Sequence, residues 1–240
     1  MARRPVRRRS ASKSAQSASV RASATPRDER EKIVAALLAL LAEKPIEQID
    51  FADIAQEAGV SLTQLRGEFV SKLAILAAHI KSIDRAVLAQ DLSDMAEEPP
   101  RERLFDVLMR RLEAMASDRD AVRSLLRSAR RNPPLALALN GLAVRSQQWM
   151  LAAAGISAAG PRGMVRAQGL ALLFSSVLRV WVRDEDTGLA RTMAALDRAL
   201  ARGQRFSGFL DDLCQIPARI CRLRSRRRRR GDDAEESVAA

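Results

Sequence analysis

The side chains with the clearest capacity for catalysis are one histidine and a short run of acids. His79 has no cysteine or carboxylate cluster around it at the spacing of metal ligands. Any Ser-His-Asp or Cys-His arrangement would depend on that single histidine, and the sequence has no glycine-rich phosphate loop. Asp184, Glu185 and Asp186 precede a helical pattern, where acids favour a helix start over an acid/base pair. We therefore expect no catalytic residue, no metal site, no cofactor and no enzymatic activity.

The cysteines and the N-terminal stretch indicate the compartment. Cys214 and Cys221 would share a helix face but lie too far apart to form a disulfide along it, so we interpret them as buried, reduced thiols. Residues 1–27 have no apolar segment of the kind found in secretory signals. Their Arg- and Ser-rich, acid-free composition is shared by mitochondrial transit peptides and by disordered basic arms of bacterial proteins. The longest uncharged stretches are shorter than the roughly 18 apolar residues of a membrane span, and we expect a cytoplasmic protein.

A different chemistry, the reading of DNA, is indicated by small and apolar residues between positions 53 and 72. A small residue lets two helices approach, a glycine permits a sharp turn, and three apolar residues hold the second helix against the first. The residues in these places are Ala55, Gly59, Val60, Leu65 and Phe69. This is the requirement of a helix-turn-helix, whose second helix lies in the major groove.

The elements that must position this turn are helices. Tyrosine is absent, 47% of the residues are hydrophobic, and alanine and leucine are prominent, so helix formers dominate. Capping residues, prolines and glycines divide the chain into helices over about 27–44, 50–59, 61–70, 71–92, 101–117, 118–131, 134–154, 162–183 and 187–202. The sequence predicts an all-α bundle of about nine or ten helices with an N-terminal three-helix head and no sheet.

The net charge of +12 is concentrated at the two ends of the chain. Residues 1–26 contain seven basic residues and no acid, and 222–240 contain seven arginines against four acids. Such tails add salt-sensitive attraction to phosphates or anionic lipids without reading bases. We expect a disordered basic arm over 1–26, a helix-turn-helix domain over 27–81, a helical ligand-binding and dimerisation domain over 82–224, and a disordered Arg-rich then acidic tail over 225–240.

The stretch "IVAALLALLAEKPIEQIDFADIAQEAGVSLTQLRGEFVSKLAIL" (33–76) resembles the DNA-binding domain of TetR-family transcriptional regulators. It has a first helix, an A-x-x-A-G-V-S turn, a leucine and a phenylalanine in the recognition helix, and Ser-Lys opening a fourth helix. The resemblance implies a homodimer that binds double-stranded operator DNA. It also implies an apolar small-molecule effector in the larger domain that releases a repressor.

The resemblance also implies the residues that would contact DNA. Ser61, Thr63, Gln64 and Arg66 would face phosphates or base edges, and Lys72 would lie at a helix N-terminus and pair with the DNA backbone.

The recognition helix departs from the family pattern at two positions. Arg66 stands where the family usually has tyrosine, and Glu68 where it has histidine or a similar residue. Arg66 is able to bind phosphate or guanine, whereas Glu68 adds repulsion near DNA. Gly67 weakens the helix by about 1 kcal/mol relative to alanine. The residues alone leave open that the motif is only a structural three-helix head.

Large apolar residues in the second half of the chain provide material for an effector pocket. The candidates are Trp149, Met150, Phe174, Leu178 and Trp181, together with Met164, Leu172 and Met193. The same set is consistent with an ordinary hydrophobic core.

An alternative follows from a looser resemblance. The stretches "NPPLALALNGLAVRSQQWMLAAAGI" and "VLRVWVRDEDTGLARTMAALDRAL" are similar to lipid-binding proteins of ubiquinone biosynthesis that share the TetR fold. The residues concerned are Asp184, Asp186, Thr192, Leu196, Asp197 and Arg198, which also suit helix caps and surface pairs. Residues 206–230 form a basic amphipathic pattern that would suit a membrane surface, packing on the bundle or a dimer contact.

Overall fold

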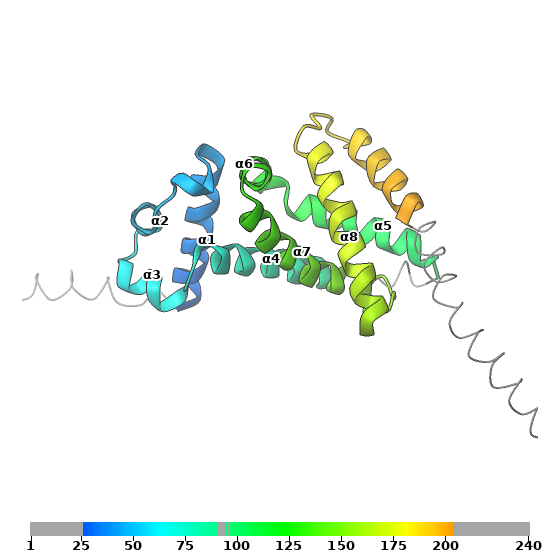
Figure 1. Ribbon diagram of the computed structural model, residues 1–240, viewed down its shortest axis with the longest axis horizontal. Coiled ribbons are helices and arrows are strands. Elements are labelled where there is room, and N and C mark those ends of the chain that lie inside the picture. The colour runs from blue at the N-terminus through cyan, green and yellow to red at the C-terminus, as the bar shows by residue number, and fades with distance from the viewer. Residues whose placement is uncertain (1–25, 91–94, 96, 204–240) are drawn as a thin grey trace, which may run out of the picture. The chain divides into compact units, whose positions relative to one another are not determined.

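The structure is a computed structural model that describes residues 26–90, 95 and 97–203. The basic arm, both cysteines and the 206–230 segment of the predictions lie outside this range. The described part is helical and contains no strand, which confirms the all-α prediction. Its helices are α1 (Pro26–Glu43), α2 (Phe51–Ala58), α3 (Leu62–Glu68), α4 (Lys72–Leu88), α5 (Pro100–Ala114), α6 (Arg119–Arg131), α7 (Pro133–Ala153), α8 (Gly160–Trp181) and a last helix over 190–203 (Figure 1). Short 3-10 turns, η2 (Ile46–Gln48) and η4 (Ala116–Asp118), follow α1 and α5.

The described residues divide into two compact units. The first, called the head, holds the residues up to His79 together with Asp120–Arg131. The second, called the large unit, holds Ile80–Arg119 and the residues from Asn132 onward. All of α6 except its first residue, Arg119, thus belongs to the head. Hydrogen bonds explain this, because the hydroxyl of Ser124 donates to the Lys44 carbonyl and that of Ser128 to the Glu47 carboxylate.

The core of the head forms where α1, α2, α3, the start of α4 and η2 bury their apolar residues against one another. Apolar positions three and four apart on α1 make one continuous stripe, which packs against α2. The fully or almost fully buried residues are Ile33, Leu37, Leu41, Ile46, Ile49, Ile54, Leu65, Phe69, Ile75 and Leu76. Because the head is small, this single cluster holds the turn between α2 and α3 in place.

The core of the large unit lies among α5, α7, α8 and the 190–203 helix, with α7 packed along α8 and α5 against α7. Its buried residues include Leu104, Val107, Leu108, Leu112, Met150, Ala167, Ala171, Val177, Trp181, Leu196 and Leu200. Prolines mark the helix starts here. Asn132 caps α7, since its side-chain oxygen accepts a 3.0 Å hydrogen bond from the Leu135 amide, so this helix begins one residue earlier than expected.

No helix within 26–90 or 97–203 combines the length and the apolar character that crossing a bilayer requires.

Candidate DNA-binding face and ligand cavity

The turn between α2 and α3 has the geometry that its sequence predicts. Gly59 adopts φ 67°, in the left-handed region, and its amide donates to the carbonyls of Ala55 and Gln56. The Val60 amide also donates to the Ala55 carbonyl, at 3.0 Å. A Cβ atom on Gly59 would meet nothing within 4 Å, so the glycine is needed for its φ angle and not for space. A side chain at this angle costs roughly 1–2 kcal/mol.

The start of α2 is held by two acids and a lysine. Asp50 and Asp53 form a capping box, and the Asp53 carboxylate forms an ion pair with Lys44, whose Nζ lies 2.6 Å away. The Lys44 hydrogen bond, followed by that of the Asp50 amide, lowers the pKa of Asp53. The carboxylate therefore stays ionised and fixes the entry of the chain into the helix-turn-helix.

Ser61 and Gln64, two predicted DNA contacts, form the capping box of α3. The Gln64 amide donates to the Ser61 hydroxyl at 3.1 Å, and Gln64 Oε1 accepts from the Ser61 amide at 2.9 Å. Gln64 Nε2 donates to Glu29 on α1, at 2.9 Å. Both side chains are exposed, yet their main bonds lie within the head, where they set the start and tilt of α3.

Lys72 opens α4 as predicted, but its ammonium group is directed to the protein. Nζ donates to the carbonyls of Ile46 and Ile49, at 2.8 and 2.7 Å, and the residue is half-buried. The Ile46 carbonyl also accepts from the Ile49 amide, at 3.4 Å, so the Lys72 bonds join the start of α4 to η2 and the residue after it. An ammonium has three donors, so one remains for an external acceptor. Sequence spacing gave no indication of this contact, because the partners lie 23 and 26 residues away.

Thr63 and Arg66 differ from the other predicted contacts. Both are exposed on α3, and neither side chain forms a hydrogen bond or an ion pair within the described residues. Because positions three apart on a helix are neighbours on its surface, the two side chains share one face. This face of α3 is therefore available to a partner.

Glu68, the residue expected to repel DNA, is compensated inside the head. Arg30 Nη1 lies 3.2 Å from both the Glu68 carboxylate and the Glu68 carbonyl. The Arg30 guanidinium also lies 4.2 Å from the centre of the Phe69 ring. The ion pair between Arg30 and Glu68 thus holds the end of α3 against α1. Because Arg30 offsets the Glu68 charge, the repulsion of DNA phosphates predicted from the sequence is reduced.

The apolar residues predicted to line a pocket are distributed differently. Met150 and Trp181 are fully buried, Phe174 is nearly so, Leu178 is half-buried, and Trp149 is 59% exposed. The Arg119 guanidinium lies 5.0 Å from the centre of the Trp181 ring and also donates to the Asp184 carbonyl, at 2.6 Å.

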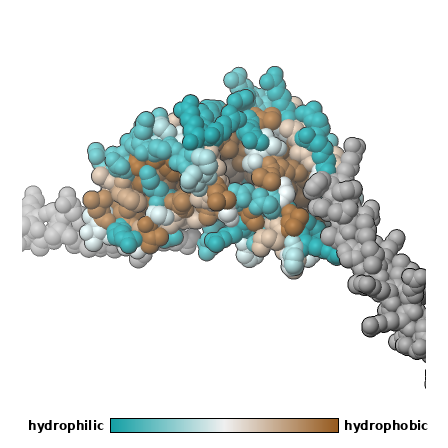
Figure 2. All heavy atoms as spheres, in the orientation of Figure 1, coloured by the Kyte–Doolittle hydropathy of each residue, from teal (hydrophilic) through white to brown (hydrophobic). Residues whose placement is uncertain are grey.

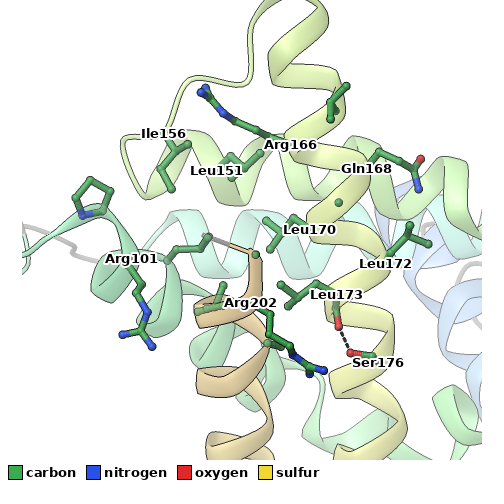
Figure 3. Close-up of a pocket in the computed structure, with 17 residues that line it drawn as sticks. Arg101, Leu151, Ile156, Arg166, Gln168, Leu170, Leu172, Leu173, Ser176 and Arg202 are labelled. Atoms are coloured by element: carbon green, nitrogen blue, oxygen red, sulfur yellow. Dashed lines mark hydrogen bonds between the residues drawn. The ribbon is translucent and has the colours of Figure 1, made fainter. Parts of the chain in front are cut away.

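A cavity of about 770 Å³ lies beside this core in the large unit, and of the eight pocket candidates only Leu172 is among its lining residues. Its walls come from α5, α7, α8 and the 190–203 helix (Figure 3). The lining residues are Pro100, Arg101, Leu104, Leu151, Ile156, Val165, Arg166, Gln168, Gly169, Leu170, Leu172, Leu173, Ser176, Ala199, Leu200, Arg202 and Gly203. Aromatic and methionine side chains were the main pocket candidates from the sequence, whereas this lining is mostly aliphatic and includes two glycines, Gly169 and Gly203.

A buried polar cluster crosses the core of the large unit. The Asp84 carboxylate pairs with Arg111 and accepts a 2.7 Å hydrogen bond from the Ser146 hydroxyl. The Arg111 guanidinium also lies 5.8 Å from the centre of the Phe174 ring. All three polar residues are at least nine-tenths buried.

The residues behind the lipid-binding resemblance form caps and pairs. The Asp184 carboxylate accepts from the amide and hydroxyl of Thr192, at 2.8 and 2.7 Å, and these bonds, the hydroxyl first, lower its pKa. Asp186 accepts from the amides of Gly188 and Ala190. Leu196 is core, Asp197 pairs with Arg101, and Arg198 is exposed.

Apolar side chains also reach the surface of α7 and α8. The exposed ones are Leu137, Trp149, Met164, Val165 and Leu172. In the view of Figure 2, hydrophobic patches are interspersed with polar residues over these helices.

Comparison with known proteins identifies the fold. No protein-family profile and no curated protein sequence matches the chain. Among solved structures, a TetR transcriptional regulator from Nitrosomonas europaea is similar with a TM-score of 0.56 and 22% identity, over 73% of this chain and 97% of that one. A TetR transcriptional regulator from Rhodococcus sp. RHA1 gives a TM-score of 0.53 and 20% identity, over 75% and 97% of the two chains. The chain therefore has the fold of TetR-family transcriptional regulators.

Proposed function

We propose that the protein is a homodimeric transcriptional regulator that binds operator DNA through α3. The observation that carries the proposal is the free face of Thr63 and Arg66 on a recognition helix whose other polar side chains hold it in position. A rigidly held helix with exposed, unpaired polar side chains is what direct readout in a major groove requires.

The charge of the head makes Arg66 the central residue of this proposal. The described residues of the head, 26–79 and 120–131, contain ten basic and ten acidic residues, so the head carries no net positive charge to attract phosphates. Specific binding must then come from local contacts, and an arginine is the side chain that pairs bidentately with guanine. Thr63, one turn before it, suits a phosphate or a thymine methyl group.

A homodimer would supply two such helices. The exposed apolar side chains of α7 and α8 provide the surface for it, since a two-fold axis lets the same patch pair with itself. Two heads related in this way meet half-sites about 34–36 Å apart on DNA.

The cavity supports control by a small apolar effector. Its volume of about 770 Å³ falls within the range of ligand pockets, and its lining is mostly apolar. A ligand that binds more tightly to the free protein than to the DNA complex releases the protein from its operator, and we propose this repressor scheme. The lipid-binding alternative is not proposed, because the residues that suggested it form helix caps and ion pairs.

The experiment is selection of a preferred sequence from random double-stranded DNA, followed by affinity measurements with Arg66→Ala. We expect this variant to lose roughly 1–3 kcal/mol for the selected sequence and little for unrelated DNA. Arg127→Ala is the matched control, since Arg127 is an exposed arginine of the head on α6. Failure to enrich any sequence, or equal effects of the two substitutions, would refute the proposal.

A further inference from the structure

We propose that the cavity of the large unit binds an amphipathic anion, with an apolar chain among its leucines and a carboxylate or similar group at Arg202. The inference rests on the proposed function in taking this ligand to be the effector. The binding site itself is argued from the cavity alone.

The walls select an extended apolar body. Leucines from four different helices face the space, namely Leu104, Leu151, Leu170, Leu173 and Leu200. No tyrosine, tryptophan or histidine is among the lining residues, so the cavity offers no ring to stack on. Flexible aliphatic walls of this kind suit an alkyl chain better than a flat aromatic ligand.

The charges at the cavity have a single sign. Arg101, Arg166 and Arg202 line it, and no aspartate or glutamate does. A ligand cation would therefore meet positive charge at the cavity walls, whereas an anion would meet complementary charge.

The three arginines differ in what they already bind. Arg101 is paired with Glu102 at 2.5 Å and with Asp197, and Arg166 donates to the Ser157 carbonyl at 3.3 Å. Arg202 donates only through Nε, to the Arg198 carbonyl at 3.3 Å, and pairs with no carboxylate within the described residues. Its terminal amino groups are therefore available to an anion.

Figure 3 shows how the three arginine side chains lie at the cavity. The Arg202 side chain extends toward the end of the cavity that contains Ser176, while the guanidinium groups of Arg101 and Arg166 point away from the leucines. The Ser176 hydroxyl donates to the Leu173 carbonyl at 2.6 Å. The arrangement places one anion-binding side chain at one end of an apolar space, which is the pattern of a long-chain acid.

The test is calorimetric titration of the full chain with three probes of the same chain length, each below its micelle-forming concentration. These are dodecanoate, dodecanol and dodecyltrimethylammonium. We expect dodecanoate to bind at least tenfold more tightly than dodecanol, because a hydrogen bond to a charged group has about that effect, and the cation to bind weakest.

Two variants locate the head group and the chain. Arg202→Gln should reduce dodecanoate affinity about tenfold and leave dodecanol unchanged, whereas the control Arg198→Gln, one turn earlier and outside the cavity, should change neither. Gly169→Leu should weaken both probes, because a Cβ there meets nothing within 4 Å and the longer side chain takes up cavity space without disturbing the backbone.

Equal affinity for all three probes, no binding of any probe, or an Arg202→Gln variant that binds dodecanoate normally would overturn the inference. These titrations contain no DNA, so their outcome is independent of operator binding. If dodecanoate binds as expected but no DNA sequence is enriched, the site stands and the regulator proposal fails. If a DNA sequence is enriched but no probe binds, the regulator proposal stands and the anion site is refuted.

Discussion

The head and the large unit differ in where their charged side chains pair. In the head the charged and capping side chains lie at or near the surface and fix helix ends, as Ser61 and Gln64 do for α3 and Lys72 does for η2. In the large unit, Asp84, Arg111 and Ser146 are buried together across three helices. The short-range contacts of the head thus set its helix ends and leave one face of α3 without a partner. The large unit instead contains a buried ion pair, and removal of either partner would leave a buried charge without its counter-ion.

The largest effect that this comparison predicts is in the large unit. Arg111→Leu should lower the free energy of unfolding by roughly 3–5 kcal/mol, because it leaves the Asp84 carboxylate buried without its cation. Chemical denaturation measures this. Adding Asp84→Leu should recover most of the loss, since an apolar pair of similar size is tolerated in a core.

The control for this prediction is Arg110→Leu on the same helix. Arg110 pairs with Asp106 at 2.6 Å on a partly exposed surface, so its loss should cost no more than about 1 kcal/mol. Equal costs for the two arginines would show that the buried pair is not special.

In the head, Lys72→Met should cost about 2 kcal/mol, since it removes two charge-assisted hydrogen bonds from a half-buried group. Denaturation followed by hydrogen exchange at η2 measures it. DNA affinity should fall for all sequences alike, in contrast to Arg66→Ala. Unchanged stability together with a reduced salt dependence of DNA binding would assign Lys72 to phosphate contact alone.

The smallest effect concerns pH. The pKa of Asp184 is lowered in the folded protein, chiefly by the Thr192 hydroxyl, so its contribution to stability is present above the ordinary pKa of about 3.9 and is lost as pH falls through the folded value. Asp184→Asn should therefore cost about 1 kcal/mol at neutral pH, the scale of a lost helix cap. The difference from wild type should shrink below about pH 4. A constant difference from pH 7 to pH 3 would contradict the assignment.

Much of the head was predictable from the sequence because its determinants are local. The Gly59 turn, the Ser61 cap and the opening of α4 each depend on residues within a few positions of one another. The clasp of Arg30 on Glu68 was not predictable, because it joins residues 38 positions apart. For the same reason, the repulsion predicted for Glu68 did not take its pairing with Arg30 into account.

In the large unit, the cavity is the feature that could not be predicted from the sequence. Helix number and type followed from periodicity, but periodicity says only that Trp181 and Met150 face inward, and not whether space remains beside them. That space depends on how small residues such as Gly169 and Ala199 meet across helices. Packing of this kind is a property of the assembled unit.

The placement of the two tryptophans has a spectroscopic consequence. The chain has no tyrosine, so its near-ultraviolet fluorescence comes from Trp149 and Trp181. Trp181 is fully buried beside a guanidinium and should emit toward the blue, while Trp149 is 59% exposed and should emit toward the red. Unfolding of the core would shift the Trp181 emission toward the red, whereas burial of the α7 surface in a contact would shift the Trp149 emission toward the blue. The intrinsic fluorescence spectrum thus distinguishes the two events.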